Sequence, residues 1–233
     1  MRRKLTFATL AALAGLLCVA SAAMAVRAIG VYSNDMETTA KRGQLLKLSG
    51  RNCDRGGSEI ALKVEIGERT KECAYRTPVV GRDLEIVATE RLLSGTPEAR
   101  RRGAFLSLSL RSGGGSRYQL LVFPLQRKYQ LRKVTDGEVE FLAVGKQINR
   151  IQGLNKANQL RLRAFNLLDT RDKDDCRLLV YVNGKRFAVV TDRGAGPLRG
   201  RFVSISAGAG RNAGGVIASF DDVAVRVPSP FAS

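Results

Sequence analysis

The chain has 233 residues, of which 39 are Lys or Arg, 21 are Asp or Glu and none is His, so its formal net charge is +18. Without histidine, a Ser-His-Asp triad, a Cys-His pair and a His-ligated metal site are all excluded. The positive charge favours acidic partners such as anionic polysaccharide, lipid headgroups or nucleic acid. The basic residues occur along the whole chain, so an arginine-rich solvated surface explains the same charge.

Residues 1–25 have the three-part pattern of a secretory signal peptide. A basic start, MRRK, precedes an apolar run that ends near Val19, and AMA before Val26 is an A-x-A cleavage site. The apolar run is shorter than the ~20 residues that span a bilayer. We therefore expect cleavage after Ala25 and a secreted, extracytoplasmic protein without a membrane span, in which residues 26–233 form a single β-sandwich domain.

Three cysteines follow the predicted cleavage site: Cys53, Cys73 and Cys176. In an oxidising compartment two of them should pair. We choose Cys53 and Cys73 because both lie in a loop-rich N-terminal segment, where closing the loop stabilises the fold by ~3 kcal/mol in the chain-entropy model. Cys176 is then a free buried thiol or an intermolecular partner. The cysteine spacings do not match a zinc site.

Before residue 104, TPEARRRG is typical of a short helical turn or a charged loop, and after it the chain has the pattern of successive short strands. FLSLSLRSG alternates strictly, with leucines on one face and serines on the other, as in a half-buried strand. YQLLVFPLQ, KYQLRKV, VEFLAVGK, NQLRLRAFN, RFVSISAGA and VIASFDDVAVRV follow, separated by glycine-containing turns. Short strands with turn signals every ~8–12 residues predict an all-β, antiparallel β-sandwich.

LLVYVNGKRFAVVTD contains the strongest short hairpin signal in the chain, because Asn-Gly at 183–184 favours a type I′ turn. A two-residue turn pairs Val180 with Phe187 and Leu178 with Val189. One face of this hairpin is then apolar and is assigned to the core. Its members are Leu178, Val180, Val182, Phe187 and Val189.

Four segments together carry a family resemblance: NQLRLRAFN, CRLLVYVNGKRFAVVTD, GRFVSISAGAG and ASFDDVAVRVP. They resemble the C-terminal half of bacterial laminin G-like domains of the concanavalin A-like lectin/glucanase superfamily, over about Phe105 to Pro228. The resemblance implies a jelly-roll sandwich. It does not imply one function, because that superfamily includes lectins, glycosidases and modules without known ligands.

Four outward side chains predict a ligand-binding patch. Arg161 and Arg163 alternate with apolar residues and face out, as do Tyr181 and Arg186 of the hairpin. The resemblance implies that these strands are antiparallel neighbours, which would gather one tyrosine beside three guanidinium groups. Guanidinium forks suit carboxylate, sulfate or phosphate groups, and tyrosine can stack on a sugar ring. We therefore expect an acidic glycan as the ligand of this patch.

Catalysis would have to depend on carboxylates. Asp221 and Asp222 are adjacent on a strand, so they should point to opposite faces and not act together. Glu138 and Glu140 directly follow an Asp-Gly turn, where a solvated strand end is expected. The E-x-D-x-x-E motif of laminarinase-like members of the superfamily does not occur in the chain. Carboxylates from distant strands still leave a glycoside hydrolase open as the alternative.

Metal and nucleic-acid binding find little support. DTRDKDDC (169–176) is acidic enough to attract calcium, but it lacks the calcium-loop pattern and Arg171 and Lys173 interrupt it, so we expect a solvated loop and no cofactor. No helix for a DNA groove and no RNA-binding aromatic signature is apparent, so nucleic acid is not an expected partner.

The sequence therefore predicts a non-enzymatic binding module for an extracellular or cell-envelope polysaccharide, or another anionic polymer. The alternatives are a glycoside hydrolase of the same fold and a structural envelope protein. The oligomeric state is not predicted. With no Trp in the chain, sugar stacking must depend on Tyr or Phe.

Overall fold

The computed structural model describes residues 29–36, 46–49, 53–56, 62–66, 72–167, 175–193, 197–209 and 216–228. The predicted signal peptide and most of the acidic loop at 169–176 lie outside these residues. The described part is almost entirely β-structure and forms two antiparallel sheets, which is the predicted jelly-roll β-sandwich. Two short helical elements also occur, α3 (Glu98–Arg101) within the predicted helical turn and the 3-10 helix η1 (Pro124–Gln126).

Sheet A has eight strands, and the C-terminal strand β15 lies near its centre. The order is β13 (Lys185–Asp192), β12 (Cys176–Val182), β11 (Asn158–Asn166), β6 (Leu84–Leu92), β15 (Val216–Val227), β4 (Leu62–Ile66) and β3 (Cys53–Gly56), with β1 (Ile29–Asn34) also paired to β15.

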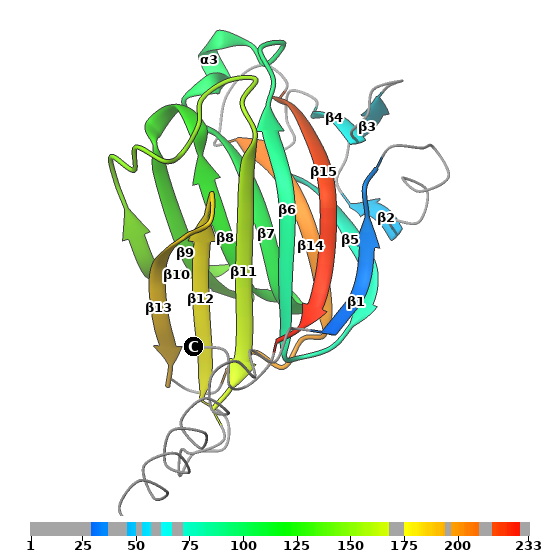
Figure 1. The fold of residues 1–233 in the computed structure, drawn as a ribbon, viewed down its shortest axis with the longest axis vertical. Coiled ribbons are helices and arrows are strands. Elements are labelled where there is room, and N and C mark those ends of the chain that lie inside the picture. The colour runs from blue at the N-terminus through cyan, green and yellow to red at the C-terminus, as the bar shows by residue number, and fades with distance from the viewer. Residues whose placement is uncertain are drawn as a thin grey trace, which may run out of the picture.

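Sheet B has seven strands and forms the second layer, behind sheet A in Figure 1. Its order is β10 (Glu138–Gly145), β9 (Lys128–Thr135), β8 (Ser116–Phe123), β7 (Ala104–Gly113), β14 (Phe202–Ala209), β5 (Glu72–Val80) and β2 (Leu46–Ser49). The meander from β7 to β10 comes from consecutive segments of the chain, and the C-terminal strands β14 and β15 insert into different sheets.

The core lies between the sheets and is filled by the inward residues of the alternating strands. Leu106, Leu108 and Leu110 of β7 are fully buried, as are Leu160 and Leu162 of β11. Burial of each such side chain stabilises the fold by about 2 kcal/mol relative to an exposed one. The period-two alternation therefore separates the core face of these strands correctly from their outer face.

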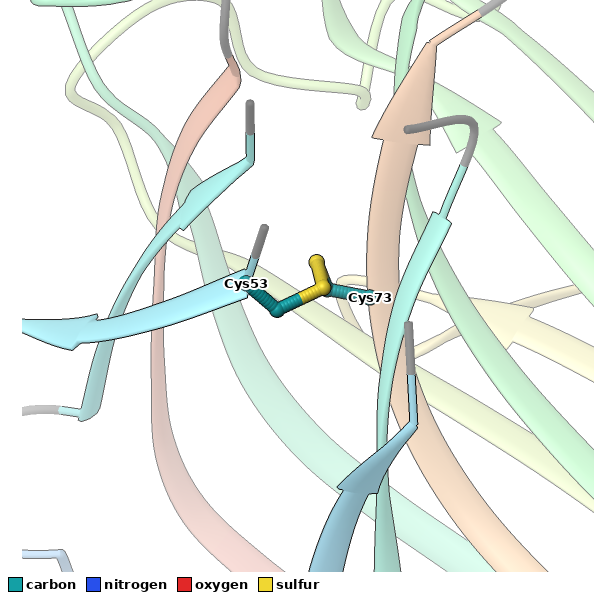
Figure 2. Close-up of a disulfide and its surroundings, with 2 residues drawn as sticks. All are labelled: Cys53 and Cys73. Carbon is teal, nitrogen blue, oxygen red and sulfur yellow. A yellow bond between two sulfur atoms is a disulfide. The ribbon is translucent and has the colours of Figure 1, made fainter. Parts of the chain in front are cut away.

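A disulfide between Cys53 and Cys73 joins the two layers (Figure 2). Cys53 begins β3 of sheet A and Cys73 lies in β5 of sheet B, with 5.9 Å between their Cα atoms. Cys176 is free and buried on the inner side of β12. The disulfide is therefore positioned to hold the β3 edge of one sheet against the other sheet.

The hairpin of β12 and β13 follows a two-residue turn at the pairs Val182–Lys185 and Tyr181–Arg186, and beyond them it departs from the predicted register. A β-bulge moves the partner of Val180 one position along the chain, to Ala188. Leu178 correspondingly pairs with Val190, so the predicted core position of Val189 is wrong. Val189 lies on the outer face and is 51% exposed. A bulge inserts one extra residue, and a shift of one residue exchanges the faces of a strand.

The described residues contain no helix that is both long and apolar enough to span a bilayer.

Candidate functional site

The outer face of sheet B carries short polar side chains that are nevertheless buried. Ser107 and Ser109 of β7 and Ser206 of β14 alternate with core residues, so they point away from the core. Outer-face side chains normally meet water, but these three serines are at most 1% exposed. Longer polar side chains from β5 and β8 cover them.

The covering side chains form a continuous hydrogen-bonded network centred on Glu72 of β5. One Glu72 carboxylate oxygen, Oε1, accepts hydrogen bonds from Gln119 Nε2 at 2.7 Å and from Ser206 Oγ at 2.7 Å. The other oxygen, Oε2, accepts from Arg117 Nη2 at 3.1 Å. Gln119 Nε2 also donates to Ser107 Oγ at 2.9 Å. The network therefore connects β5, β7, β8 and β14 above the serines.

These contacts require the outer face of sheet B to be concave. Glu72 on β5 and Gln119 on β8 are separated by β14 and β7, and three strand spacings amount to ~14 Å in a flat sheet. Side chains that stand perpendicular to a flat sheet would not meet across that distance. They do meet, so the sheet curves toward its outer side along the line from β5 to β8.

Two guanidinium groups converge on one oxygen atom in this network. Gln119 Oε1 accepts hydrogen bonds from Arg132 Nη2 at 2.7 Å, from Arg132 Nε at 3.0 Å and from Arg117 Nε at 3.2 Å. Burial lowers the pKa of Arg132, the Glu72 carboxylate opposes this shift, and the nearby positive charge of Arg117 adds to it. The two cations are therefore held close together with Glu72 as their nearby counter-charge.

An exposed apolar strip lies directly beside the arginine pair. Phe141 of the edge strand β10 is the register partner of Arg132 and is 57% exposed. Val139 and Val144 of β10 pair with outward residues of β9 and are also exposed. The outer face of sheet B thus combines hydrogen-bond donors with an accessible aromatic ring. We call Glu72, Arg117, Gln119, Arg132 and Phe141 the concave-face site.

The structure brings together three of the four residues of the predicted patch, on the outer face of sheet A. Arg161 of β11 pairs with Tyr181 of β12, with its guanidinium carbon 5.2 Å from the ring centroid. Arg186 of β13 is the next partner of Tyr181 and is exposed. Arg163 shares this face but is only 5% exposed and packs over Phe165. Its guanidinium is therefore largely withdrawn from solvent.

Part of the positive charge of that patch is already balanced within the fold. Glu85 of β6 is buried, and its Oε1 lies 4.0 Å from Arg161 Nε and 3.8 Å from Arg226 Nη1. Both arginine side chains remain at least a third exposed. The predicted patch therefore offers mainly the stacked Arg161–Tyr181 pair and Arg186 to a ligand.

The expectation that Asp221 and Asp222 point to opposite faces is wrong. Asp222 has a positive φ of 47°, and β15 contains an irregularity here, so both side chains lie outside between the buried Phe220 and Val223. Asp221 accepts a hydrogen bond from the Asp222 backbone N–H at 3.0 Å and lies 3.7 Å from Arg91. Burial, followed by the Asp222 charge, raises the pKa of Asp221.

The other acidic side chains of interest point away from the outer face of sheet B, since Glu138 and Glu140 alternate on β10 with the outward Val139 and Phe141. Glu138 and Glu140 are exposed on β10, as expected for a solvated strand end. Glu90 of β6 points into the core between the sheets and is fully buried. Burial raises the pKa of Glu90 well above its usual value. The nearby Ser107 backbone opposes this rise in the Glu90 pKa. Neither carboxyl oxygen, however, accepts a hydrogen bond of normal geometry from the described residues.

A second polar cluster, formed around Asp192, is buried inside the sandwich. Tyr118 donates a hydrogen bond to Asp192, and Lys133 Nζ lies 2.9 Å from the same carboxylate oxygen. The Tyr118 oxygen also accepts from the Leu198 backbone N–H at 3.1 Å. Burial raises the pKa of the neighbouring Cys176 thiol to about 11. A protonated, buried thiol is a poor nucleophile, so this cluster is best explained as structural.

No cluster of three or more His, Cys, Asp or Glu side chains suited to a metal ion occurs in the part of the chain that the structure describes. The acidic loop considered for calcium at 169–176 lies mostly outside that part.

No family model matches the chain, and no curated protein matches it. Solved structures do share its fold. The carbohydrate-binding module CBM66 from Bacillus subtilis has a TM-score of 0.57 and 16% identity, covering 78% of this chain and 96% of its own. A Bacillus subtilis protein of unknown function with a galectin-like fold has a TM-score of 0.63 and 13% identity, covering 85% and 96%. The Bacillus licheniformis β-glucanase has a TM-score of 0.58 and 10% identity, covering 86% and 99%.

At these identities the likeness shows the fold alone. The chain shares with these proteins the antiparallel β-sandwich fold that the sequence predicts.

Sequence reasoning missed the concave-face site. Alternation in FLSLSLRSG places Ser107 and Ser109 on the face opposite the core leucines, which the structure bears out, while KYQLRKV was predicted only as a strand. Nothing in the sequence, however, brings Glu72 next to Gln119, because these residues are 47 positions apart and on strands that do not pair.

Proposed function

We propose that this protein is a non-enzymatic polysaccharide-binding module and that it binds its ligand on the outer face of sheet B. The observation that carries the proposal is the exposed Phe141 ring beside the half-buried Arg132 and Arg117 on a concave polar face. An aromatic ring offers a flat apolar surface to a sugar ring, and guanidinium groups donate hydrogen bonds in fixed directions. The fold shared with a carbohydrate-binding module supports the proposal.

The proposal includes an extracytoplasmic location and an anionic envelope or extracellular polymer as partner. The Cys53–Cys73 disulfide supports an oxidising compartment. The signal-peptide pattern of residues 1–25 and the net charge of +18 agree with this. Within the superfamily, membership of the laminin G-like group is part of the same proposal and is supported by the C-terminal motifs.

The concave-face site supports binding better than hydrolysis. A glycosidase of the carboxylate-pair type needs two carboxyl groups ~5–10 Å apart across the bond that it breaks. Glu72 is the one carboxylate that the described strands of sheet B place on this face, and three side chains donate hydrogen bonds to it. The β-glucanase of the same fold nevertheless makes hydrolysis the alternative to test.

A glycan array read at low and at physiological salt would test the proposal, using the parent protein, Phe141→Ser and Val189→Ser. Phe141 and Val189 are both exposed apolar residues on edge strands, but on different sheets. We expect at least a fivefold loss of binding for Phe141→Ser and almost none for Val189→Ser, because only Phe141 adjoins the concave-face site. Equal losses would contradict the assignment of the face.

The same samples also test the alternatives. If any bound polysaccharide gains reducing ends on incubation with the parent protein, the hydrolase is correct and the non-enzymatic module is wrong. If no glycan binds at physiological salt, a structural envelope protein is favoured.

The predicted patch on sheet A is the second candidate surface, because Arg161 stacks on Tyr181 next to the exposed Arg186. Its test compares the double variant Arg161→Glu/Arg186→Glu with Arg101→Glu/Arg102→Glu, which changes the net charge equally. Arg186 takes the place of Arg163 because the latter is nearly buried. A larger loss of glycan binding for the first variant would assign the ligand to sheet A.

A further inference from the structure

Among the described residues, the two positive charges of the arginine pair of the concave-face site face one carboxylate, that of Glu72. Arg117 and Arg132 both donate to the neutral oxygen of Gln119, and Glu72 reaches Arg117 at 3.1 Å. Two like charges around one amide oxygen repel each other, and this repulsion weakens when an anion binds near both. The Arg117 side chain is 30% exposed, so a ligand can reach it.

We propose that Arg117 and Arg132 select sugar units that carry a carboxylate or a sulfate group. This inference rests on the proposed function and names the ligand class of the same site. A guanidinium presents parallel N–H donors that match two oxygens of one carboxylate or sulfate. A neutral hydroxyl accepts a weaker hydrogen bond and does not relieve the repulsion between the two cations.

The position of Phe141 sets how such a sugar would lie. Phe141 and Arg132 are register partners on neighbouring strands, so their Cβ atoms lie ~5 Å apart. That separation is comparable to the width of one sugar ring. A ring stacked on Phe141 therefore directs a charged substituent at its edge toward Arg132, and the next binding group of the site is Arg117, beyond Gln119.

Glu72 acts in this arrangement as an internal counter-ion that competes with the ligand. Its carboxylate is held by Arg117, Gln119 and Ser206, and its side chain remains 19% exposed. An acidic sugar must share or displace the Arg117 contact. Replacing Glu72 with the uncharged Gln keeps the shape and removes the competing charge, so Glu72→Gln should bind acidic polymer more tightly.

The test measures affinity by isothermal titration calorimetry at physiological salt, with two pairs of probes. Polygalacturonate and its methyl ester differ in the carboxylate, and dextran sulfate and dextran differ in the sulfate. We expect the parent protein to bind at least one charged polymer at least tenfold more tightly than its neutral counterpart. The arm with the larger ratio identifies the charged group.

Two double variants with the same net charge distinguish the loss of the site from the general effect of a lower net charge. Arg117→Gln/Arg132→Gln and the control Arg82→Gln/Arg201→Gln each remove two positive charges, and both control residues are exposed. We expect at least a tenfold loss of affinity for the charged polymer in the first variant and less than a threefold loss in the control. Arg132→Lys keeps the charge without the guanidinium fork and should lose part of the affinity, while Glu72→Gln should gain about threefold.

The outcomes distinguish this inference from the proposed function. If the neutral polymer binds as tightly as the charged one, both the selection of acidic sugars and the anionic character of the proposed partner are wrong, and polysaccharide binding still stands. If the arginine variant loses no more affinity than the control, only the selection by Arg117 and Arg132 is wrong. If none of the four polymers binds the parent protein, both fail. If Arg117→Gln/Arg132→Gln does not fold, the affinities of Arg132→Lys and Glu72→Gln for the charged polymer serve as the test. Unchanged affinity in both variants would overturn the inference.

Discussion

The buried polar side chains on the outer faces of the two sheets find their partners in different ways. On sheet A, the buried Glu85 is balanced by Arg161 and Arg226, whose side chains remain 34% and 41% exposed. On sheet B, Gln119 is fully buried and bridges Glu72, Ser107 and two arginines by hydrogen bonds of 2.7–3.2 Å. A concave surface thus concentrates donors and acceptors that a more open surface leaves to water.

The two outer faces differ in how well they suit ligand binding. Salt bridges with partly exposed partners contribute little to stability, since water and salt screen them. A network whose geometry is fixed by neighbouring side chains holds its donors in place before a ligand arrives, and this lowers the entropic cost of binding. This difference supports the proposal that the binding site lies on sheet B.

The largest expected effect separates the inner face from the outer face of sheet A. Val180→Asp should lower the free energy of unfolding by about 4 kcal/mol, because it buries an unpaired carboxylate in the core. Tyr181→Ser, one residue further along but on the outer face, should cost about 1 kcal/mol. Urea unfolding of both variants measures the difference. A larger loss for Tyr181→Ser would mean that the faces of β12 are exchanged, and equal losses would contradict the assignment of Val180 and Tyr181 to different faces.

A smaller difference in the free energy of unfolding is expected between variants of the two outer faces. Gln119→Met should cost about 2 kcal/mol, because Ser107 and Glu72 each lose a buried hydrogen bond. Glu85→Met should cost less than about 1 kcal/mol, since Arg161 and Arg226 can return to water. Thermal unfolding checks both values. If the Glu85 variant is the less stable of the two, sheet A holds the tighter network.

The smallest expected effect on stability comes from the carboxyl group of Glu90, which is buried between the sheets. Burial raises the folded-state pKa of Glu90 above the ordinary value of 4.5, so the folded protein binds this proton more tightly than the unfolded chain does. Stability is therefore greatest below pH 4.5 as far as Glu90 is concerned, and it falls as the pH rises toward the folded-state pKa. Glu90→Gln should remove this decline.

The measurement for Glu90 is the unfolding free energy of parent and variant at several pH values from 5 to 8. A parent that gains stability over this range relative to Glu90→Gln would show that the sign is wrong.

Alternation in the sequence was enough to find most strands and both of their faces, since the leucines of FLSLSLRSG and NQLRLRAFN occupy the core as predicted. It could not find the bulges. The extra residue in β13, Phe187, which lies between the partners of Tyr181 and Val180, and the positive-φ residue Asp222 each reversed an assignment of faces. Each bulge is a local backbone conformation without a clear sequence signal.

The candidate sites were harder to predict than the fold. The sequence placed Arg161 next to Tyr181 correctly, because these residues lie on strands that pair directly. The concave-face site depends instead on the curvature of a sheet, which brings Glu72 to Gln119 across two intervening strands. Curvature is a collective property of all strands in the sheet and has no pattern of its own in the chain.

The most direct test of the account is a titration followed by amide chemical shifts in NMR, with polygalacturonate oligomers added to the uniformly labelled protein. We expect the largest shifts on β8, β9 and β10, around Gln119, Arg132 and Phe141, and little change on β11, β12 and β13. Shifts concentrated around Arg161, Tyr181 and Arg186 instead would contradict the assignment of the binding site to sheet B.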